Sequence, residues 1–240
     1  MAHALDRESL AEVMVKDRGL VSDSWIQRGT PVYQAQGSKI VTYPYDPARA
    51  AQLFQEAGWN RAPDGILQTA AGDKFKFECW CAATYGPIMQ GDWKRAGVDS
   101  DLVITPPQLS SNLEYQASFP GIQGTGNAIS FSFIDGRFHS RNIARAENRW
   151  GGQNRSAYAD PMADELVERL LATLDQAERW NVEGDLANLI TRNAVFWWLY
   201  HPTPASVAKK GMIGIKPNRA TGHSGDLLVT WNIAEWDLTR

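Results

Sequence analysis

Residues 43–59, "YPYDPARAAQLFQEAGW", contain the signals of one complete helix. Asp46 followed by Pro47 predicts its start: an aspartate at the N-cap accepts hydrogen bonds from free backbone N–H groups, and proline at the first helical position loses none. Gly58 predicts its end, because glycine readily adopts the left-handed conformation that closes helices. We therefore expect a helix over residues 47–57, packed on a core by one side. That side carries four residues at helical spacing: Ala50, Leu53, Phe54 and Ala57.

Composition and charge exclude several classes of protein. The 240 residues carry a net charge of −3, whereas proteins that bind nucleic acids present a clustered basic face. The longest apolar run, residues 194–200, is much shorter than the roughly 18 residues that a membrane-spanning helix needs. The first residues, "MAHALDRESL", have neither the basic start nor the apolar centre of a signal peptide, so we expect no export signal in this chain. The ten tryptophans favour a binding cleft in which one or two of them stack on a ligand.

The segment after this helix predicts a strand, a helix and a second strand. In residues 74–82, "KFKFECWCA", apolar and polar side chains alternate strictly, which is typical of a half-buried strand. Residues 86–97 have the pattern of a short helix, and "DLVIT" at 101–105 has that of a second strand. A βαβ unit of this kind implies a parallel pair with a right-handed crossover.

Five further segments have the sequence pattern of a helix or a strand. We expect helices over residues 5–18, 160–180 and 177–192, and strands over 195–200 and 227–231. Asp6 is the expected cap of the first helix, and Asp160 with Pro161 repeats the Asp-Pro start in the second. The side chains expected on the buried faces of the helices are Leu10, Val13, Met14, Met162, Leu166, Leu170, Leu174, Leu186, Leu189 and Ile190.

Two regions lack such periodicity. Residues 19–42 are rich in Gly, Ser and Pro and predict a loop. Residues 106–160 are too long for a structureless loop in a compact domain, so we expect short helices and binding loops there. The glycine-rich stretch 121–130 favours a loop over a phosphate site, because no clear strand-to-helix turn accompanies it.

Catalytic and metal-binding motifs are absent from the sequence. Cys79 and Cys81 face the same side of a strand, and we expect two separate thiols packed in the core, because a bond between them would strain an extended backbone. The histidines are scattered, and no nucleophile elbow, P-loop or dinucleotide fingerprint occurs. We therefore expect no enzyme activity, no cofactor and no metal site. The alternative, an enzyme that uses the two thiols, would be supported by rapid labelling of the native protein with a thiol reagent.

Trp80 has the best position for a ligand contact among the residues of the βαβ unit. It lies on the polar face at the carboxyl end of the first strand, where open α/β sheets bind ligands. Tyr85 follows in the next loop. The structural alternative is that Trp80 packs under a helix on a two-sided sheet.

Several motifs resemble family 5 extracellular solute-binding proteins, the oligopeptide-, dipeptide- and nickel-type receptors of ABC importers. The stretch at 43–59 is similar to that family's "P-x-x-A-x-x-L-x-x-A-G" segment. The other matching segments keep the family's order and spacing along almost the whole chain. They are "ALDRESL" (4–10), "IMQGDWKRAGVDSDLV" (88–103), "GQNRSAYADPMADELVERLLA" (152–172) and "VFWWLYHP" (195–202).

The resemblance covers the C-terminal half of a family member. It implies an α/β fold with a mixed sheet flanked by helices, the second lobe of a type II periplasmic-binding-protein-like fold. Residues 1–200 would form this lobe, and residues 201–240 a tail that returns toward the first lobe. The full-length parent would lie in the periplasm or at the cell surface, capture a peptide or other small molecule, and deliver it to an ABC permease.

The resemblance also indicates where a ligand would bind. Trp80 and Tyr85 would supply apolar walls, and Asn127, Arg137 and Arg155 polar contacts. Peptide-binding members carry an acidic residue that anchors the ligand's amino group, whereas residues 118–133 contain no acidic residue and no tryptophan. Asn127 is the nearest polar equivalent. This departure weakens the case for a peptide held by its amino terminus and leaves room for sugars and anionic solutes.

A second class of function remains open. The half-length chain could be an interaction module that pairs with a partner or with itself, through apolar groups that normally face the other lobe. A monomer in light scattering would count against this hypothesis.

Overall fold

The computed structural model describes residues 1–16, 19–126, 128–202, 208–216 and 232–238. Its mixture of helices and strands confirms the predicted α/β class. Its buried apolar side chains form two hydrophobic clusters. The helical cluster involves α2 (Pro31–Gln36), α6 (Phe131–Phe138), α7 (Pro161–Ala172) and α8 (Gln176–Arg192). The sheet cluster involves α1 (Arg7–Val15), α3 (Pro47–Glu56), β4 (Lys76–Trp80), α4 (Gly86–Arg95) and β5 (Asp99–Val103).

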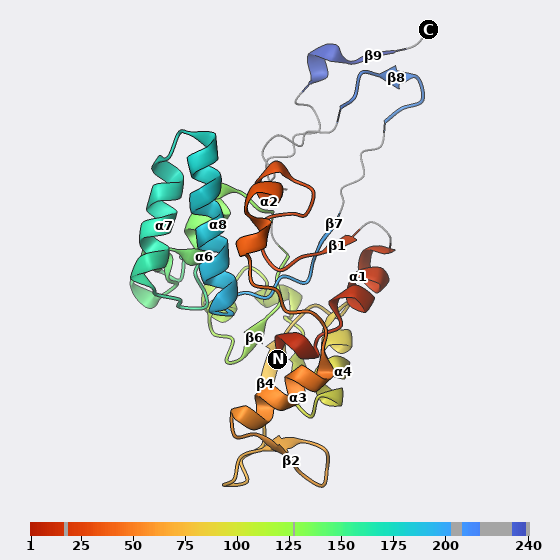
Figure 1. Ribbon diagram of the computed structural model, residues 1–240, viewed down its shortest axis with the longest axis vertical. Helices are drawn as coiled ribbons and strands as arrows, with labels where there is room; N and C mark the ends of the chain where they lie inside the picture. Colours follow the sequence, from red (N-terminus) through yellow and green to blue (C-terminus); the bar gives the residue numbers. More distant parts are fainter. Residues whose placement is uncertain (17–18, 127, 203–207, 217–231, 239–240) are drawn as a thin grey trace.

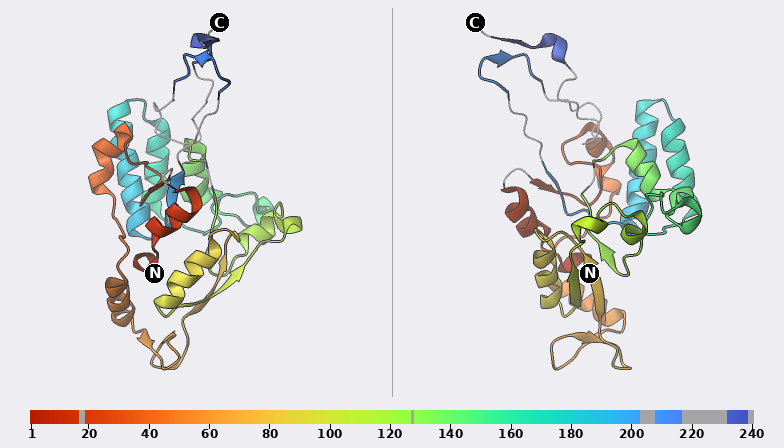
Figure 2. Two further views of the ribbon diagram at one scale, coloured as in Figure 1. Left: turned by 90° about the vertical axis from the view of Figure 1, so that its right-hand side faces the viewer. Right: turned by 180° about the vertical axis from the view of Figure 1, so that it is seen from behind.

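The two clusters occupy different parts of the molecule. Figure 1 shows α6, α7 and α8 side by side in one part, and α3, α4 and β4 in the other. A short pair of strands, β8 (Met212–Ile213) and β9 (Asp237–Leu238), projects away from both, as the two views in Figure 2 agree.

The sheet of the second cluster has the strand order β5-β4-β6, where β6 is Ile122–Gln123. Both neighbours run parallel to β4, with Cys79 opposite Leu102 on one side and opposite Ile122 on the other. The βαβ unit is therefore confirmed, with α4 as the crossover, although each strand is shorter or shifted by about two residues. The sequence did not predict β6, because two residues are too few to show the alternation of apolar and polar side chains that indicates a strand.

Helix α3 confirms the interpretation of residues 43–59. The Asp46 carboxylate accepts a hydrogen bond from Arg49 N at 2.9 Å, and Gly58 has a φ of +84°. Ala50 and Phe54 are buried as predicted. The expectation for Ala57 was wrong: the helix ends at Glu56, and Ala57 is an exposed C-cap residue.

Helix α1 is shorter than predicted and begins at the expected cap, Asp6. Leu10 is buried, but Val13 is 66% exposed, because the buried face is centred on Arg7, Leu10 and Ala11. Arg7 joins this helix to distant segments. Its guanidinium donates hydrogen bonds to the carbonyl oxygens of Ser22, Tyr43 and Trp198, and pairs with Asp23 at 2.7 Å.

Helices α7 and α8 form an antiparallel hairpin that provides much of the helical cluster. Leu166, Leu170, Leu186, Leu189 and Ile190 are buried as predicted. Two other expectations were wrong: Met162 is 57% exposed and Leu174 is 92% exposed. Helix α7 ends at Ala172, which leaves Leu174 in the connecting loop, and its buried face instead includes Ala163 and Val167, which turns Met162 outward.

Residues 19–42 contain more structure than the predicted loop. Strand β1 (Gly19–Val21) pairs antiparallel with β7 (Tyr200–Pro202), and helix α2 starts at a Thr30 cap. The expected boundary at residue 200 thus falls at the start of β7. The course of the tail stays a prediction, and the strand expected over 227–231 lies outside the described residues.

The strand predicted over residues 195–200 is wrong for its first five residues, which pair with no neighbouring strand in the described part of the chain. These residues run between the two clusters and contribute side chains to both. Phe196 and Trp198 pack in the helical cluster, whereas Trp197 and Leu199 pack in the sheet cluster. The apolar run that suggested a strand therefore lies in the core, but core packing replaces strand pairing.

Cys79 and Cys81 are buried as expected, but they are joined in a disulfide. The expectation of two separate thiols was wrong. Because residues i and i+2 of a strand face the same side, the two Cα atoms lie 5.6 Å apart, within the usual range for a disulfide. With both cysteines of the sequence bonded, the hypothesis of thiol catalysis loses its nucleophile.

The remaining elements are short, and those in residues 106–160 confirm the short helices expected there. They are β2 (Asn60–Arg61), β3 (Leu67–Gln68), α5 (Leu113–Ala117) and 3-10 helices at Ala2–Ala4, Gly37–Lys39, Pro107–Leu109, Ser140–Asn142, Ala146–Asn148 and Ile233–Glu235. Within the described ranges, no helix combines the length and the apolar character that crossing a membrane requires.

Candidate ligand-binding cavity

A cavity of about 690 Å³ lies between the two hydrophobic clusters. This volume is within the range that small-molecule sites usually have. One wall is the loop that continues from β6 at the carboxyl edge of the parallel strands, which is where α/β sheets commonly bind ligands. The other walls come from the start of α4, from α6, from the loop around residue 155 and from residues 194–202.

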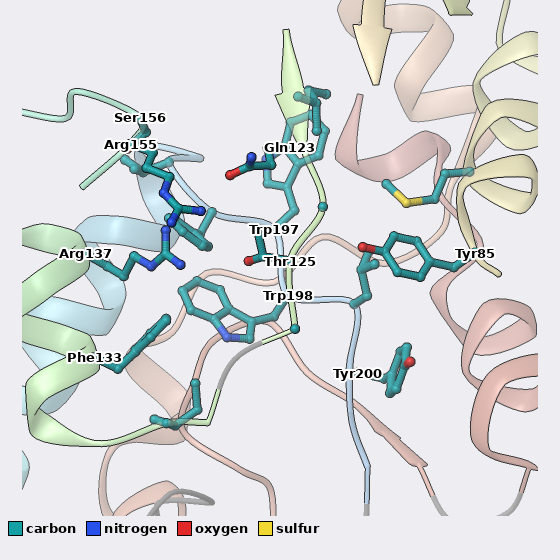
Figure 3. A pocket seen from close by; sticks show the side chains of 18 of the residues that line it. Tyr85, Gln123, Thr125, Phe133, Arg137, Arg155, Ser156, Trp197, Trp198 and Tyr200 are labelled. Carbon is teal, nitrogen blue, oxygen red and sulfur yellow. The ribbon is translucent and has the colours of Figure 1, made fainter. Parts of the chain in front are cut away.

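Residues 194–202 bring several aromatic side chains to the cavity. Trp197, Trp198 and Tyr200 line it, and Figure 3 shows Trp198 near its centre. The ring of Trp198 packs against the ring of the buried Trp25, with ring centroids 5.6 Å apart. The sequence analysis missed these residues as site residues, although the high tryptophan content was a signal that aromatic groups line a cleft.

Arg137 enters the cavity from α6, a helix capped by Ser130, whose Oγ accepts a hydrogen bond from Phe133 N at 3.1 Å. Its Nη1 donates to the Gln153 carbonyl at 2.9 Å, and its guanidinium lies 5.8 Å from the centre of the Phe133 ring. Burial, together with the neighbouring positive charge of Arg155, lowers the pKa of Arg137 to about 10. The group therefore stays charged at neutral pH.

Arg155 lies beside Arg137, and Figure 3 shows both guanidinium groups on the same side of the cavity. Burial also lowers the pKa of Arg155. Its Nε is buried without a hydrogen-bond partner among the described residues. None of the ion pairs found in the described ranges involves Arg155.

Tyr85 faces the cavity from the start of α4, on the side away from the two arginines (Figure 3). Burial raises the pKa of its hydroxyl, and the nearby Tyr200 raises it further. A hydrogen bond from the Ala82 backbone has the opposite effect and lowers this pKa. The loop opposite is tightly packed: a Cβ added at Gly124 would lie 2.5 Å from Tyr85 Oη, which explains why glycine stands there.

The structure thus brings three of the five predicted site residues to one cavity: Tyr85, Arg137 and Arg155. Trp80 does not line it. Its indole N–H donates to Glu78 at 2.8 Å, and its ring packs on Tyr115 with centroids 4.5 Å apart. Asn127 lies outside the described residues. The ligand contacts of all five stay predictions.

The polar groups of the cavity are cationic or neutral. Among its described lining residues none is Asp or Glu, and the neutral polar ones include Gln27, Gln123, Thr125 and Ser156. Nor do the described residues contain a group of three or more His, Cys, Asp or Glu side chains that could hold a metal ion.

A cavity at the edge of a parallel sheet, closed by aromatic and polar side chains, is typical of α/β proteins that bind small molecules. Residues 1–144 match the family described as bacterial extracellular solute-binding proteins, family 5 Middle. The match spans more than half of the chain, which therefore belongs to this family. No curated protein matches the chain in sequence.

Solved structures share the fold. NikZ from Campylobacter jejuni, in complex with Ni(L-His), is 21% identical, with a TM-score of 0.71 over 98% of this chain and 47% of that chain. The oligopeptide-binding protein AppA from Bacillus subtilis, in complex with a nonapeptide, is 22% identical, with a TM-score of 0.71 over 100% of this chain and 46% of that one. HbpA2 from Haemophilus parasuis is 17% identical, with a TM-score of 0.72 over 100% and 44%. This chain therefore spans less than half the length of each.

Proposed function

We propose that this chain holds a small solute, a peptide or another small molecule, for an ABC importer. The observation that carries the proposal is the cavity between the two clusters. Its size suits a small ligand, its centre is aromatic, and a few polar groups converge on it. Tyr85, Arg137 and Arg155 would contact the solute, whereas contacts by Trp80 and Asn127 remain predictions.

The rest of the transport cycle is part of the same proposal. Capture would end with hinge closure of two lobes and delivery to a permease, without chemical change of the solute, so the chain would not act as an enzyme. The Cys79–Cys81 disulfide supports an oxidising compartment such as the periplasm or the cell surface. Self-association, the basis of the alternative hypothesis, stays a prediction.

The first experiment is a solute screen on the purified chain. Peptides, amino acids, sugars and organic acids are tested by thermal unfolding, and every hit is measured by calorimetric titration. A solute at about 100 times its Kd stabilises the folded state by about 2.7 kcal/mol. For a chain of this size, that free energy raises the Tm by roughly 5–10 °C.

A cavity-filling substitution tests where the solute binds. Ser156 is exposed and lines the cavity, so Ser156→Trp should abolish the Tm shift by occupying the space of the ligand. Ser111 is exposed and is not among the lining residues, so Ser111→Trp should keep the shift. The proposal fails if no solute raises the Tm, or if the Ser156→Trp variant binds the solute as the wild type does.

A further inference from the structure

We propose that the cavity selects solutes that combine a carboxylate or another oxyanion with a flat apolar body, and that carry no ammonium group. This inference rests on the proposed function and specifies the solute class of the same cavity.

The first step is the paired cations. Arg137 and Arg155 extend from different segments into one side of the cavity, where their like charges face each other (Figure 3). Two adjacent guanidinium groups repel each other unless an anion lies between them. They also present planar sets of N–H donors that match the oxygens of a carboxylate or phosphate.

The second step is the state of Arg155. Its buried Nε has no hydrogen-bond partner in the described parts of the chain. The ion pairs found there do not include Arg155. A buried donor without a partner is costly, and charged groups cost more than neutral ones. An oxyanion that accepts from the outer nitrogens of the Arg155 guanidinium would compensate its positive charge, so the binding energy at this side of the cavity depends on the charge of the ligand.

The third step concerns ammonium groups. The described lining residues include no carboxylate that could pair with a ligand cation. A peptide with a free amino terminus would bury its ammonium group beside two arginines, and so would meet both desolvation and repulsion. The cavity therefore discriminates against amines as well as favouring anions.

The fourth step is the shape of the apolar part. Trp198, Phe133, Tyr200 and Tyr85 surround the remaining space with ring faces and edges (Figure 3). Aromatic side chains pack best on flat partners, in offset or edge-to-face arrangements. In a ligand with a planar apolar body attached to an anionic group, the anion would contact the two arginines and the planar body would pack on the aromatic side chains.

Three matched probes separate these contributions. N-acetylphenylalanine carries a carboxylate and no amine, N-acetylphenylalaninamide is neutral, and phenylalaninamide is a cation when the titrations are made at a pH of about 6, below the pKa of its α-amino group. None of them contains indole, so the tryptophan fluorescence of the protein reports binding. We expect the acid to bind at least about tenfold more tightly than the neutral amide, since a charge-assisted hydrogen bond contributes roughly 1.5–3 kcal/mol. The cation should bind more weakly than both.

Variants test the role of Arg155. Arg155→Gln should weaken binding of the acid about tenfold and leave the neutral amide within about twofold, because only the charged contact is lost. Arg155→Lys should keep part of the preference for the acid. Arg169→Gln, the same change at an exposed α7 residue outside the cavity, should bind all three probes as the wild type does.

Two sets of results would overturn the inference while leaving solute capture intact. In one, the amide or the cation binds as tightly as the acid, or Arg155→Gln weakens all three probes equally. In the other, none of the probes binds and the hits of the solute screen lack an oxyanion. A screen without any hit is a different outcome, because it removes the proposed function itself. If an anionic hit is found, phosphate and carboxylate versions of it identify the oxyanion.

Discussion

Asp6, Asp46 and Asp160 each accept a hydrogen bond from a free backbone N–H at the start of a helix. A cap of this kind contributes about 1 kcal/mol and depends on residues that are neighbours in sequence. The sequence therefore predicted all three helix starts. It did not predict the bond between Cys79 and Cys81, because the alternation that places both sulfurs on one face is the same whether the thiols are free or joined.

His201 should make the stability of the folded chain depend on pH. Its Nε2 donates to the Ser24 carbonyl at 2.8 Å, and burial lowers its pKa, although this hydrogen bond raises it slightly. The unfolded state therefore binds a proton more readily than the folded state. The contribution of His201 is complete above a pH of about 6.5, the usual pKa of histidine, and is lost as the pH falls toward the lower folded value.

Urea unfolding at pH 7.5 and 5.5 measures this effect. His201→Gln keeps an N–H donor without the titration, so the free energy of unfolding should fall less between the two pH values than in the wild type. His3→Gln, the same change at a less buried histidine, controls for general effects of the substitution. An equal fall in the wild type and in His201→Gln would contradict the prediction.

At the scale of elements, long periodic segments could be predicted and short ones could not. Strand β4 follows from strict alternation, and α8 from its apolar face, because each pattern repeats several times. Strand β6 has two residues, and it is a strand only because it pairs with β4. Residues 195–199 show the opposite case, since a strand pattern is present but the segment has no partner strand within the described residues.

The loop that leads into β6 offers a test at this scale. A Cβ at Gly121 would lie 2.4 Å from the Glu78 carbonyl oxygen, whereas nothing lies within 4 Å of a Cβ at Gly126. Gly121→Ala should therefore push β6 away from β4 and lower the free energy of unfolding by about 1–3 kcal/mol.

Gly126→Ala, in the loop that follows β6, is the matched control and should change the free energy of unfolding by less than about 0.5 kcal/mol. Urea midpoints at constant m-value measure both. Equal effects of the two substitutions would show that the close approach at Gly121 can relax.

At the scale of the whole molecule, the family and the α/β class could be predicted, and the cavity only in part. Tyr85 was found because it follows the carboxyl edge of a predicted strand. Trp80 lies at the same edge but faces away, since side chains alternate along a strand and Cys79 and Cys81 occupy the other face. The position of Trp198 depends on packing between segments far apart in sequence, which no local pattern contains.

The two hydrophobic clusters should unfold together, because residues 195–199 pack in both. Native-state hydrogen exchange tests this without any substitution. The most protected amides of α8 and of β4 should report the same free energy of opening, within about 1 kcal/mol, as expected for one cooperative unit. A clearly lower value for either element would show that its cluster opens alone.

The alternating course of residues 196–199 has a consequence for how this segment can change length during evolution. One inserted residue after Phe196 would exchange the destinations of the next two side chains, and send Trp198 toward the sheet cluster and Trp197 toward the helical one. Two inserted residues would restore the destinations. The insertions and deletions that this segment tolerates should therefore contain an even number of residues.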